Sequence, residues 1–301
     1  MPEHLIELES LGDEGIARIV RRAREIRDLP REEAAALCAG REVVHLFLEP
    51  STRTRVSFEI AAGRVGARVI DFDTDASSLS KGETLADTLR TIEAMGTDAF
   101  VVRHREDGVP RTMASIARGA VINAGAGTTA HPTQGLLDRL TLVDEFGDLT
   151  GRSIAIVGDV RHSRVAGSDI VAFASAGMRV HLVAPPELQR EDVSTPVERT
   201  DDLDALLPEL DAVVMLRIQR ERLAVDLSLD TDAFIARYQL TAERLARLPE
   251  PGVVLHPGPM NRGVEITDEV ADGPRSRILD QVGHGVEVRM AVLEHCLGGP
   301  R

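Results

Sequence analysis

The sequence predicts an α/β fold with two domains, each a mostly parallel sheet flanked by helices. Apolar stretches of strand length alternate with amphipathic stretches of helix length, a pattern typical of parallel sheets. The series begins afresh near residue 153, after a long helical stretch. A chain of 301 residues is long enough for two hydrophobic cores. We therefore expect domains of residues 1–133 plus 286–301 and of residues 134–285, with the active site in the cleft between them.

The first half of the chain contains four predicted strands. A helix is expected over residues 12–29, where apolar side chains recur at helical spacing. The strands are expected at residues 43–48, 67–72, 98–102 and 120–123, and further helices at 56–62, 85–95 and 110–118. In the helix at 56–62, Val56 and Ile60 are expected to face the core.

The second half repeats this architecture without a periodic sequence repeat. A helix with inward leucines is expected over residues 134–146 and leads into the second domain. Strands are expected at residues 153–158, 179–183, 211–216 and 253–256, and a closing helix at 282–297. Each strand therefore ends near a loop that can carry functional side chains.

Composition excludes several classes of protein. A net charge of −14, no Trp and one Tyr argue against a nucleic-acid-binding protein, which needs a basic surface and stacking aromatics. No apolar stretch approaches the ~18 residues of a membrane helix, and no signal peptide is visible at the N-terminus. Cys38 and Cys296 lack metal-ligand spacing and are expected to be reduced thiols of a cytoplasmic protein.

Residues 51–55 form the most unusual stretch of the chain. They place three hydroxyls and two guanidinium groups between a predicted buried strand and a predicted helix. A helix start presents backbone N–H groups that favour an anion, and Ser51 or Thr52 can cap it. Arg53 and Arg55 add donors suited to phosphate. The alternative is a capped surface helix with two solvated arginines, but packing alone explains these arginines poorly.

Other residues suited to anions follow the predicted strands. They are Arg103, His131 and Gln134, Arg164, Arg217 and Gln219, and the loop at 256–259. Ligands of open α/β sheets bind at the carboxyl ends of strands, so these groups are expected to converge. Taken singly, Arg103 can be a surface residue and His131 a helix cap. Together they describe a pocket for a phosphate and one or more carboxylates.

The motifs that are missing narrow the chemistry. The sequence contains no G-x-G-x-x-G fingerprint, no P-loop, no G-x-S-x-G elbow and no metal-ligand spacing. We therefore expect no cofactor and no metal. The remaining interpretation is an enzyme that positions two anionic substrates and polarises a carbonyl without a covalent intermediate.

Two motifs resemble those of the aspartate/ornithine carbamoyltransferase superfamily. Residues 47–59, Phe-Leu-Glu-Pro-Ser-Thr-Arg-Thr-Arg-Val-Ser-Phe-Glu, resemble its signature, and residues 131–138, His-Pro-Thr-Gln-Gly-Leu-Leu-Asp, its second motif. The stretches at 81–84, 216–223 and 255–263 resemble the aspartate carbamoyltransferase catalytic chains within it. The His-Cys-Leu-Pro motif expected of the ornithine enzymes is absent, and the arginines would repel ornithine's amine.

The resemblance implies a transferase reaction. The carbamoyl group of carbamoyl phosphate would pass to L-aspartate, giving N-carbamoyl-L-aspartate and phosphate, a step of pyrimidine biosynthesis. It also implies a homotrimer with active sites shared between subunits, and it leaves open a larger assembly with regulatory chains or dihydroorotase. Two alternatives stay open, namely a carbamoyltransferase for ornithine or another amine, and a catalytically silent scaffold homologue.

The resemblance also assigns roles to residues. The phosphate would be held by Ser51, Thr52, Arg53 and Thr54, with Arg103 closing over it. The carbonyl oxygen would receive hydrogen bonds from Thr54, Arg103 and His131, each worth roughly 3 kcal/mol in the transition state. The carbamoyl amine would be fixed by Gln134 and by the loop at Gly258 and Pro259.

The acceptor would be held by residues of the second domain and of a neighbouring subunit. Arg164 and Arg217, helped by Gln219, would bind the aspartate carboxylates. Lys81, with Ser78, would reach in from the neighbouring subunit, unless Lys81 is a solvated loop lysine.

Two further expectations concern closure and proton transfer. Glu49 is expected to pair with Arg164 or Arg222, although the segment 161–163 departs from the better-known family members. The departing phosphate is expected to accept the proton, because no side chain in the motifs is an obvious general base.

Overall fold

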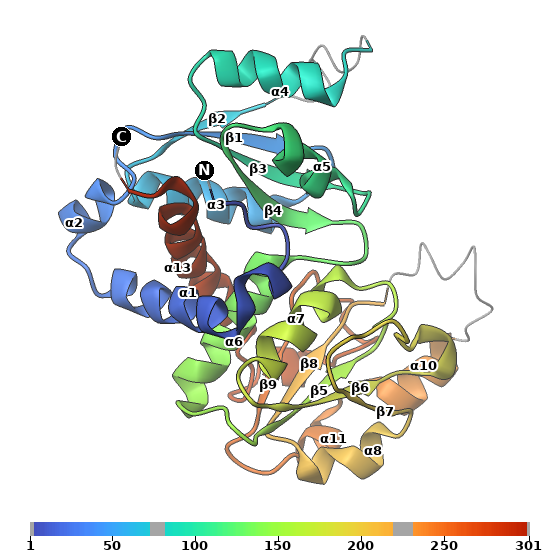
Figure 1. Cartoon of the computed structure of the whole chain (residues 1–301). Coiled ribbons are helices and arrows are strands. Elements are labelled where there is room, and N and C mark those ends of the chain that lie inside the picture. Colours follow the sequence, from blue (N-terminus) through green and yellow to red (C-terminus); the bar gives the residue numbers. More distant parts are fainter. Residues whose placement is uncertain (1–2, 73–81, 219–230, 300–301) are drawn as a thin grey trace. The chain divides into compact units, whose positions relative to one another are not determined.

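The computed structural model describes residues 3–72, 82–218 and 231–299 (Figure 1). The chain divides into two compact units, one of Met1–Leu140 with Val282–Arg301 and one of Thr141–Gln281. Both divisions fall inside helices, α6 (Pro132–Phe146) and α13 (Ile278–Leu297). The domain boundaries expected from the sequence, after residues 133 and 285, differ from these by seven and four residues.

The first unit is built on a parallel sheet. Within the described residues its strands run in the order β2-β1-β3-β4. They are β1 (Glu42–Phe47), β2 (Arg68–Asp71), β3 (Ala99–His104) and β4 (Ala120–Ala126). The pairs β1–β2, β1–β3 and β3–β4 are all parallel. The four strands predicted for this half are therefore confirmed, with boundaries that agree to within three residues.

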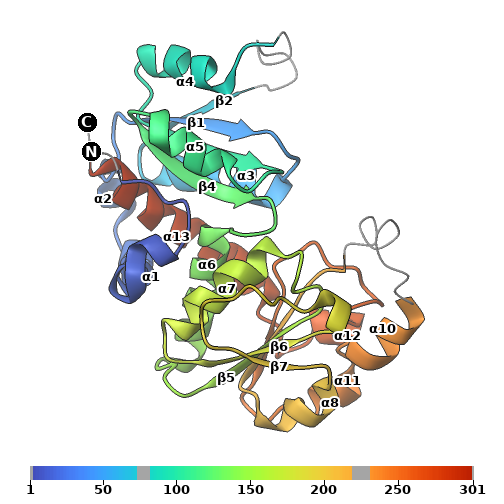
Figure 2. The ribbon, with the colours of Figure 1, turned by 45° about the vertical axis from the view of Figure 1, so that its right-hand side comes forward.

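Helices cover both faces of this sheet. They are α1 (Gly12–Arg27), α2 (Arg31–Ala36), α3 (Thr52–Arg64), α4 (Leu85–Ala94) and α5 (Val109–Ile116), preceded by the 3-10 turn η1 (Glu9–Leu11). Leu89 of α4 and Met113 of α5 pack with Val44, Phe100 and Val121 of the strands. Figures 1 and 2 show α4 and α5 on one side of the sheet and α13 on the other.

Helix α3 differs from its prediction in start and in orientation. It begins at Thr52, one turn earlier than expected. The expectation that Val56 and Ile60 face the core is wrong, because they are 46% and 42% exposed. The buried face instead carries Phe58, whose ring lies 6.2 Å from His45 of β1. The face of α3 that packs on the sheet carries one large ring with small residues around it. The spacing of apolar residues alone does not identify this face.

The second unit has its own parallel sheet. Within the described residues the strand order is β7-β6-β5-β8-β9. The strands are β5 (Ser153–Val157), β6 (Arg179–Val183), β7 (Glu198–Thr200), β8 (Ala212–Met215) and β9 (Val253–Leu255). Strand β7 was not predicted, because its Glu-Arg-Thr sequence carries no apolar pattern. It adds to the sheet as an edge strand by pairing with β6.

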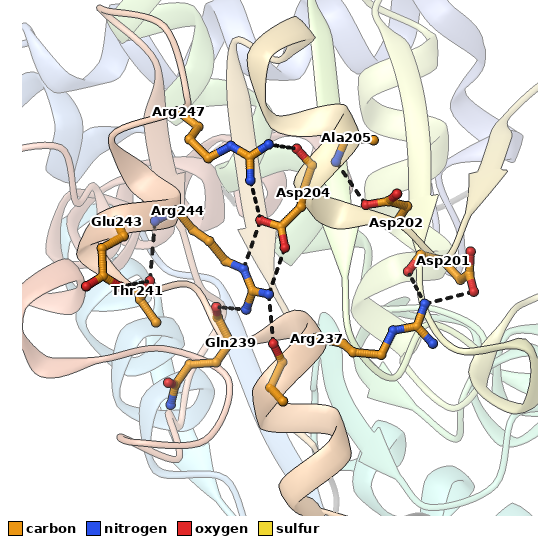
Figure 3. A network of polar contacts seen from close by, with 11 residues as sticks. Asp201, Asp202, Asp204, Ala205, Arg237, Gln239, Thr241, Glu243, Arg244 and Arg247 are labelled. Carbon is orange, nitrogen blue, oxygen red and sulfur yellow. Dashed lines mark hydrogen bonds and ion pairs between the residues drawn. The ribbon is translucent and has the colours of Figure 1, made fainter.

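Short helices connect the strands of the second unit. They are α7 (Arg164–Ala174), α8 (Leu203–Leu206), α10 (Thr231–Tyr238), α11 (Ala242–Leu245) and α12 (Asp268–Ala271), with the 3-10 turns η3 (Pro186–Leu188) and η4 (Leu207–Glu209). Arg244 of α11 connects to two more of these helices (Figure 3). Its guanidinium donates to both carboxylate oxygens of Asp204 in α8 and to the carbonyl of Ala236 in α10, and also to the carbonyl of Gln239. Among the described helices, none is long and apolar enough to cross a membrane.

Candidate active site

The start of helix α3 is the first part of the candidate site. Strand β1 ends at Phe47, and Ser51 occupies the N-cap position with an extended backbone at φ −160° and ψ 105°. The Ser51 side chain forms no capping hydrogen bond. The expected cap by Ser51 is therefore not formed. The first-turn N–H groups and the Ser51 hydroxyl are donors that suit an anion at this helix terminus.

The side chains of this loop differ in their surroundings. Thr54 is buried, whereas Thr52 and Arg53 are exposed. Arg55 forms an ion pair with Asp71 of β2. The sequence offered both arginines as phosphate donors, but the pair with Asp71 directs Arg55 to the sheet edge, so Arg53 is the better candidate.

Arg103 lies at the end of β3, the strand next to β1. One of its Nη groups donates to the carbonyl of Ala124 at 3.1 Å, and its Nε lies 3.7 Å from the Glu49 carboxylate. The backbone N–H of Leu48 bonds the Arg103 carbonyl at 2.9 Å. This bond connects the loop before α3 to β3. It therefore fixes the distance between the start of α3 and the end of β3, which both carry groups suited to anions. The expected pairs of Glu49 with Arg164 or Arg222 stay predictions.

His131 and Gln134 follow β4, the next strand of the same sheet. Asp107 holds the intervening loop by accepting from the N–H groups of Thr128 and Thr129 at 2.8 and 2.9 Å. The buried His131 directly precedes α6, and its carbonyl accepts from the Gln134 N–H at 2.9 Å. Because β1, β3 and β4 are neighbours, the residues that follow them lie at one carboxyl edge of this sheet.

Two polar residues behind Gln134 were not selected from the sequence. Asp138 of α6 accepts from the Gln134 side chain, and Arg289 of α13 is buried with its guanidinium 5.1 Å from the Phe58 ring. Burial lowers the pKa of Arg289 to about 9, and the nearby Asp138 carboxylate opposes that shift. One sequence feature could have identified Arg289, because it is a charged residue among the apolar residues of the closing helix.

The second unit places Arg164 at the first position of α7, after β5. Ser163 caps this helix, its hydroxyl accepting from the Ala166 N–H at 3.2 Å. The preceding loop is held by the buried Asp159, which accepts from the backbone N–H of His162 at 3.1 Å. Gly158 adopts φ 123°, and a Cβ there would lie 2.9 Å from the Leu216 carbonyl. The ends of β5 and β8 can approach this closely because residue 158 is a glycine.

The loops after β8 and β9 complete the edge of the second sheet. Arg217 follows β8, and the neighbouring Ile218 carbonyl accepts from Asn261 at 3.0 Å. After β9, Nδ1 of His256 accepts from the Gly258 N–H at 2.8 Å, and its Nε2 lies 3.2 Å from Glu265. Because β5, β8 and β9 are neighbours, Arg164, Arg217 and the loop at 258–259 share one carboxyl edge.

Four predicted residues lie outside the described part of the chain, namely Ser78, Lys81, Gln219 and Arg222. Among the described residues, no three His, Cys, Asp or Glu side chains gather as possible metal ligands. The first unit therefore presents a helix N-terminus, hydroxyls and a guanidinium suited to phosphate. The second presents two arginines suited to carboxylates.

Family models match both units of the chain. The carbamoyl-phosphate-binding domain of the aspartate/ornithine carbamoyltransferases matches residues 3–145, and their aspartate/ornithine-binding domain matches residues 150–296. The aspartate carbamoyltransferase catalytic subunit of Salinispora tropica is 48% identical over 99% of both chains. That of Acidothermus cellulolyticus is 50% identical over 99% of this chain and 94% of its own.

Solved structures of the same kind are similar throughout. Aspartate transcarbamoylase of Trypanosoma cruzi, in complex with N-(phosphonacetyl)-L-aspartic acid, is 32% identical with a TM-score of 0.89 over 98% of this chain and 95% of its own. The same enzyme with carbamoyl phosphate and aspartate also gives 32% and 0.89, over 98% and 96%. This chain belongs to the aspartate/ornithine carbamoyltransferase family.

Proposed function

We propose that this chain is an aspartate carbamoyltransferase, which moves the carbamoyl group of carbamoyl phosphate onto the amine of L-aspartate and releases phosphate. The observation that carries the proposal is the division of anion-binding groups. One sheet edge offers a helix N-terminus with Arg53 and Arg103, and the other offers Arg164 and Arg217. Relatives named for the aspartate reaction, and neighbours solved with carbamoyl phosphate and aspartate, support this choice of substrates.

The phosphate end of the donor is assigned to the start of α3. The hydroxyls of Ser51, Thr52 and Thr54 and the first-turn N–H groups donate to the phosphate oxygens, with Arg53 and Arg103 supplying charge. Two guanidinium groups and a helix dipole neutralise a dianion better than neutral donors alone. This arrangement also stabilises phosphate as a leaving group.

The carbonyl carbon is activated by hydrogen-bond donors to its oxygen. Thr54, Arg103 and His131 donate to the carbonyl oxygen, which gains charge as the tetrahedral intermediate forms. Thr54 and His131 are buried, so their hydrogen bonds act in a low dielectric. Gln134 and the loop at Gly258 and Pro259 bind the carbamoyl amine and fix the orientation of the group.

The acceptor is assigned to the second unit. Arg164 and Arg217 bind the two carboxylates of aspartate, with Gln219 as a further donor. Ornithine carries a second amine in place of the side-chain carboxylate, and two guanidinium groups disfavour it. Holding both substrates supplies effective molarities of roughly 10⁵ M or more. The free amine attacks, and the departing phosphate accepts the proton.

The proposal includes a homotrimer in which Ser78 and Lys81 complete a neighbour's active site. The exposed apolar side chains of Val56 and Ile60 on α3 support an interface on this unit. The proposal leaves open a larger assembly with regulatory chains or dihydroorotase.

We place the reaction in the cytoplasm, as a step of pyrimidine biosynthesis. The thiols of Cys38 and Cys296 are free and buried, which fits a reducing compartment. Burial raises the pKa of Cys38 to about 12, so this thiol is unreactive at neutral pH.

A product assay with purified protein tests the function. Incubation with carbamoyl phosphate and L-aspartate is expected to give N-carbamoyl-L-aspartate and phosphate in equal amounts, whereas L-ornithine gives no citrulline. Light scattering on the same sample is expected to give the mass of three chains. Turnover with ornithine alone would assign the other family branch, and no turnover with any amine would point to a silent homologue.

A further inference from the structure

A buried polar trio lies behind the carbamoyl end of the donor site. Gln134 and Asp138 of α6 are 8% and 0% exposed, and Arg289 of α13 is 4% exposed. Of these three, only Gln134 has a role in the proposed reaction. A buried carboxylate and a buried guanidinium are costly to desolvate, so their presence here needs an explanation.

Asp138 fixes which end of the Gln134 amide faces the substrate. The Gln134 Nε2 donates to both Asp138 carboxylate oxygens, at 3.0 and 3.2 Å. An ionised carboxylate only accepts hydrogen bonds, so it must face the amide NH₂ group and not the amide oxygen. The Gln134 Oε1 therefore faces away from Asp138, as an acceptor.

Arg289 places a positive charge in electrostatic range of the Asp138 carboxylate. Its guanidinium lies over the Phe58 ring, 5.1 Å from the centroid, and interacts electrostatically with the Asp138 carboxylate. Although burial lowers the pKa of Arg289 to about 9, the side chain is still a cation at neutral pH. A cation beside a buried carboxylate favours the ionised carboxylate.

Space for Arg289 is provided by a glycine one turn earlier in α13. A Cβ at Gly285 would lie 2.4 Å from Nη1 of Arg289 and 3.2 Å from Leu137. The guanidinium thus occupies the volume that any side chain at residue 285 would take. Gly283 of the same helix meets no atom within 4 Å of such a Cβ, so only one of these two glycines serves this packing.

We propose that Asp138 and Arg289 are positioning residues that hold the Gln134 amide with Oε1 toward the carbamoyl NH₂ group. This inference rests on the proposed function, since it assumes that carbamoyl phosphate is the donor. Thr54, Arg103 and His131 then donate to the carbonyl oxygen of carbamoyl phosphate. The Gln134 Oε1, held by the other two members of the trio, accepts from its amine. A reversed amide would set two NH₂ groups against each other.

The consequence is selectivity among acyl phosphates. Acetyl phosphate has a methyl group where carbamoyl phosphate has its amine, and a methyl group donates no hydrogen bond. The wild-type protein is therefore expected to bind carbamoyl phosphate more tightly than acetyl phosphate. The shared phosphate end is assigned to the start of α3 and to Arg103, neither of which belongs to the trio.

Calorimetric titration of the full chain with these two ligands tests the proposal. Asp138→Asn can present either its oxygen or its NH₂ group to Gln134, so the Gln134 amide is no longer fixed. We expect carbamoyl phosphate to bind about tenfold more weakly, with acetyl phosphate within twofold of wild type. An equal loss for both ligands would indicate a structural role only, and no loss for either would also overturn the proposal.

A rescue variant separates positioning from general damage. The double variant Gln134→Glu with Asp138→Asn exchanges the amide and the carboxylate between the two positions. The carboxylate introduced at position 134 accepts from the amide introduced at position 138 and still offers an accepting oxygen to the carbamoyl amine. We expect this pair to recover most of the preference lost in Asp138→Asn. Failure of the recovery, in a variant that melts like the single variant, counts against the proposal.

Gly285→Ala tests Arg289 without substituting any residue of the trio. Alanine favours helix more than glycine does, so the fold is expected to persist while the new methyl displaces the guanidinium. We expect a loss of preference for carbamoyl over acetyl phosphate of at least about threefold, and no change in the control Gly283→Ala. An unchanged preference in Gly285→Ala would remove Arg289 from the proposal. A wild-type protein that binds neither ligand would instead refute the proposed function.

Discussion

His45 of β1 shows how burial sets the charge of a single residue. Its ring makes edge contacts with the rings of Phe47 and Phe58, with centroids 5.6 and 6.2 Å away. Burial lowers the pKa of His45 to about 4, and the positive charge of Arg55 contributes to this shift. The imidazole is therefore neutral in the folded protein at any pH near neutrality.

This burial predicts a pH dependence of stability. Above pH 6.5 both folded and unfolded chains hold a neutral His45, so the residue adds no pH dependence there. As pH falls from 6.5 toward 4, only the unfolded chain gains a proton, and the folded state loses stability. Between pH 8 and pH 5, the free energy of unfolding is expected to fall by about 2 kcal/mol more in the wild type than in His45→Leu. Urea unfolding at the two pH values measures this difference. Parallel pH profiles for both proteins would contradict this.

For single residues, sequence reasoning selected the candidate binding residues but not the residues that hold them in position. Ser51, Arg103 and His131 stand out because polar groups follow apolar strands. Arg289 does not, because its neighbours Asp138 and Phe58 are far away in the sequence. The ion pair of Arg55 with Asp71 was not foreseen for the same reason, since Asp71 lies on another strand. Long-range pairing is the information that a single sequence lacks.

At the scale of elements, the packing of α8, α10 and α11 depends on one carboxylate. Asp204 bonds the fork of Arg244 at 3.1 and 2.9 Å and Arg247 at 2.8 Å (Figure 3). The hydrogen bonds from Arg244 lower the pKa of Asp204. Three short helices are thus held by a two-arginine network, which stabilises more than an isolated surface pair does.

Removing this carboxylate is expected to weaken the second unit. Asp204→Asn should cost about 1 kcal/mol at pH 7 after allowance for solvent screening. Because the folded pKa of Asp204 is depressed, its contribution is present above the unfolded value and is lost as pH falls through the folded pKa. Asp201→Asn, which breaks an exposed pair with Arg237, is the matched control and should leave stability unchanged. Equal unfolding midpoints for all three proteins would contradict the assignment.

A comparison of α1 with α3 and β7 shows where the apolar pattern of a sequence fails to predict structure. The stripe of α1, including Ile16 and Ile19, is buried as expected, because one apolar face meets one core. Helix α3 has apolar residues on two faces, so periodicity could not decide which face meets the sheet. Strand β7 has no apolar pattern and exists only because β6 offers an edge to pair with.

For the whole molecule, the parallel topology explains why so much of the candidate site could be predicted. In a parallel sheet, loops after neighbouring strands gather at one edge. Residues far apart in the sequence, such as Ser51 and His131, or Arg164 and Arg217, therefore share an edge once strand order is known. The strand order itself comes from the structure.

The central claim is that each unit supplies one half of the substrate-binding groups. The most direct test is calorimetric binding of N-(phosphonacetyl)-L-aspartate, which joins a phosphonate to an aspartate. We expect tight binding by the wild type, and a loss of about a hundredfold in either Thr54→Val or Arg217→Met. Binding that tolerates the loss of Arg217 while requiring Thr54 would contradict the claim.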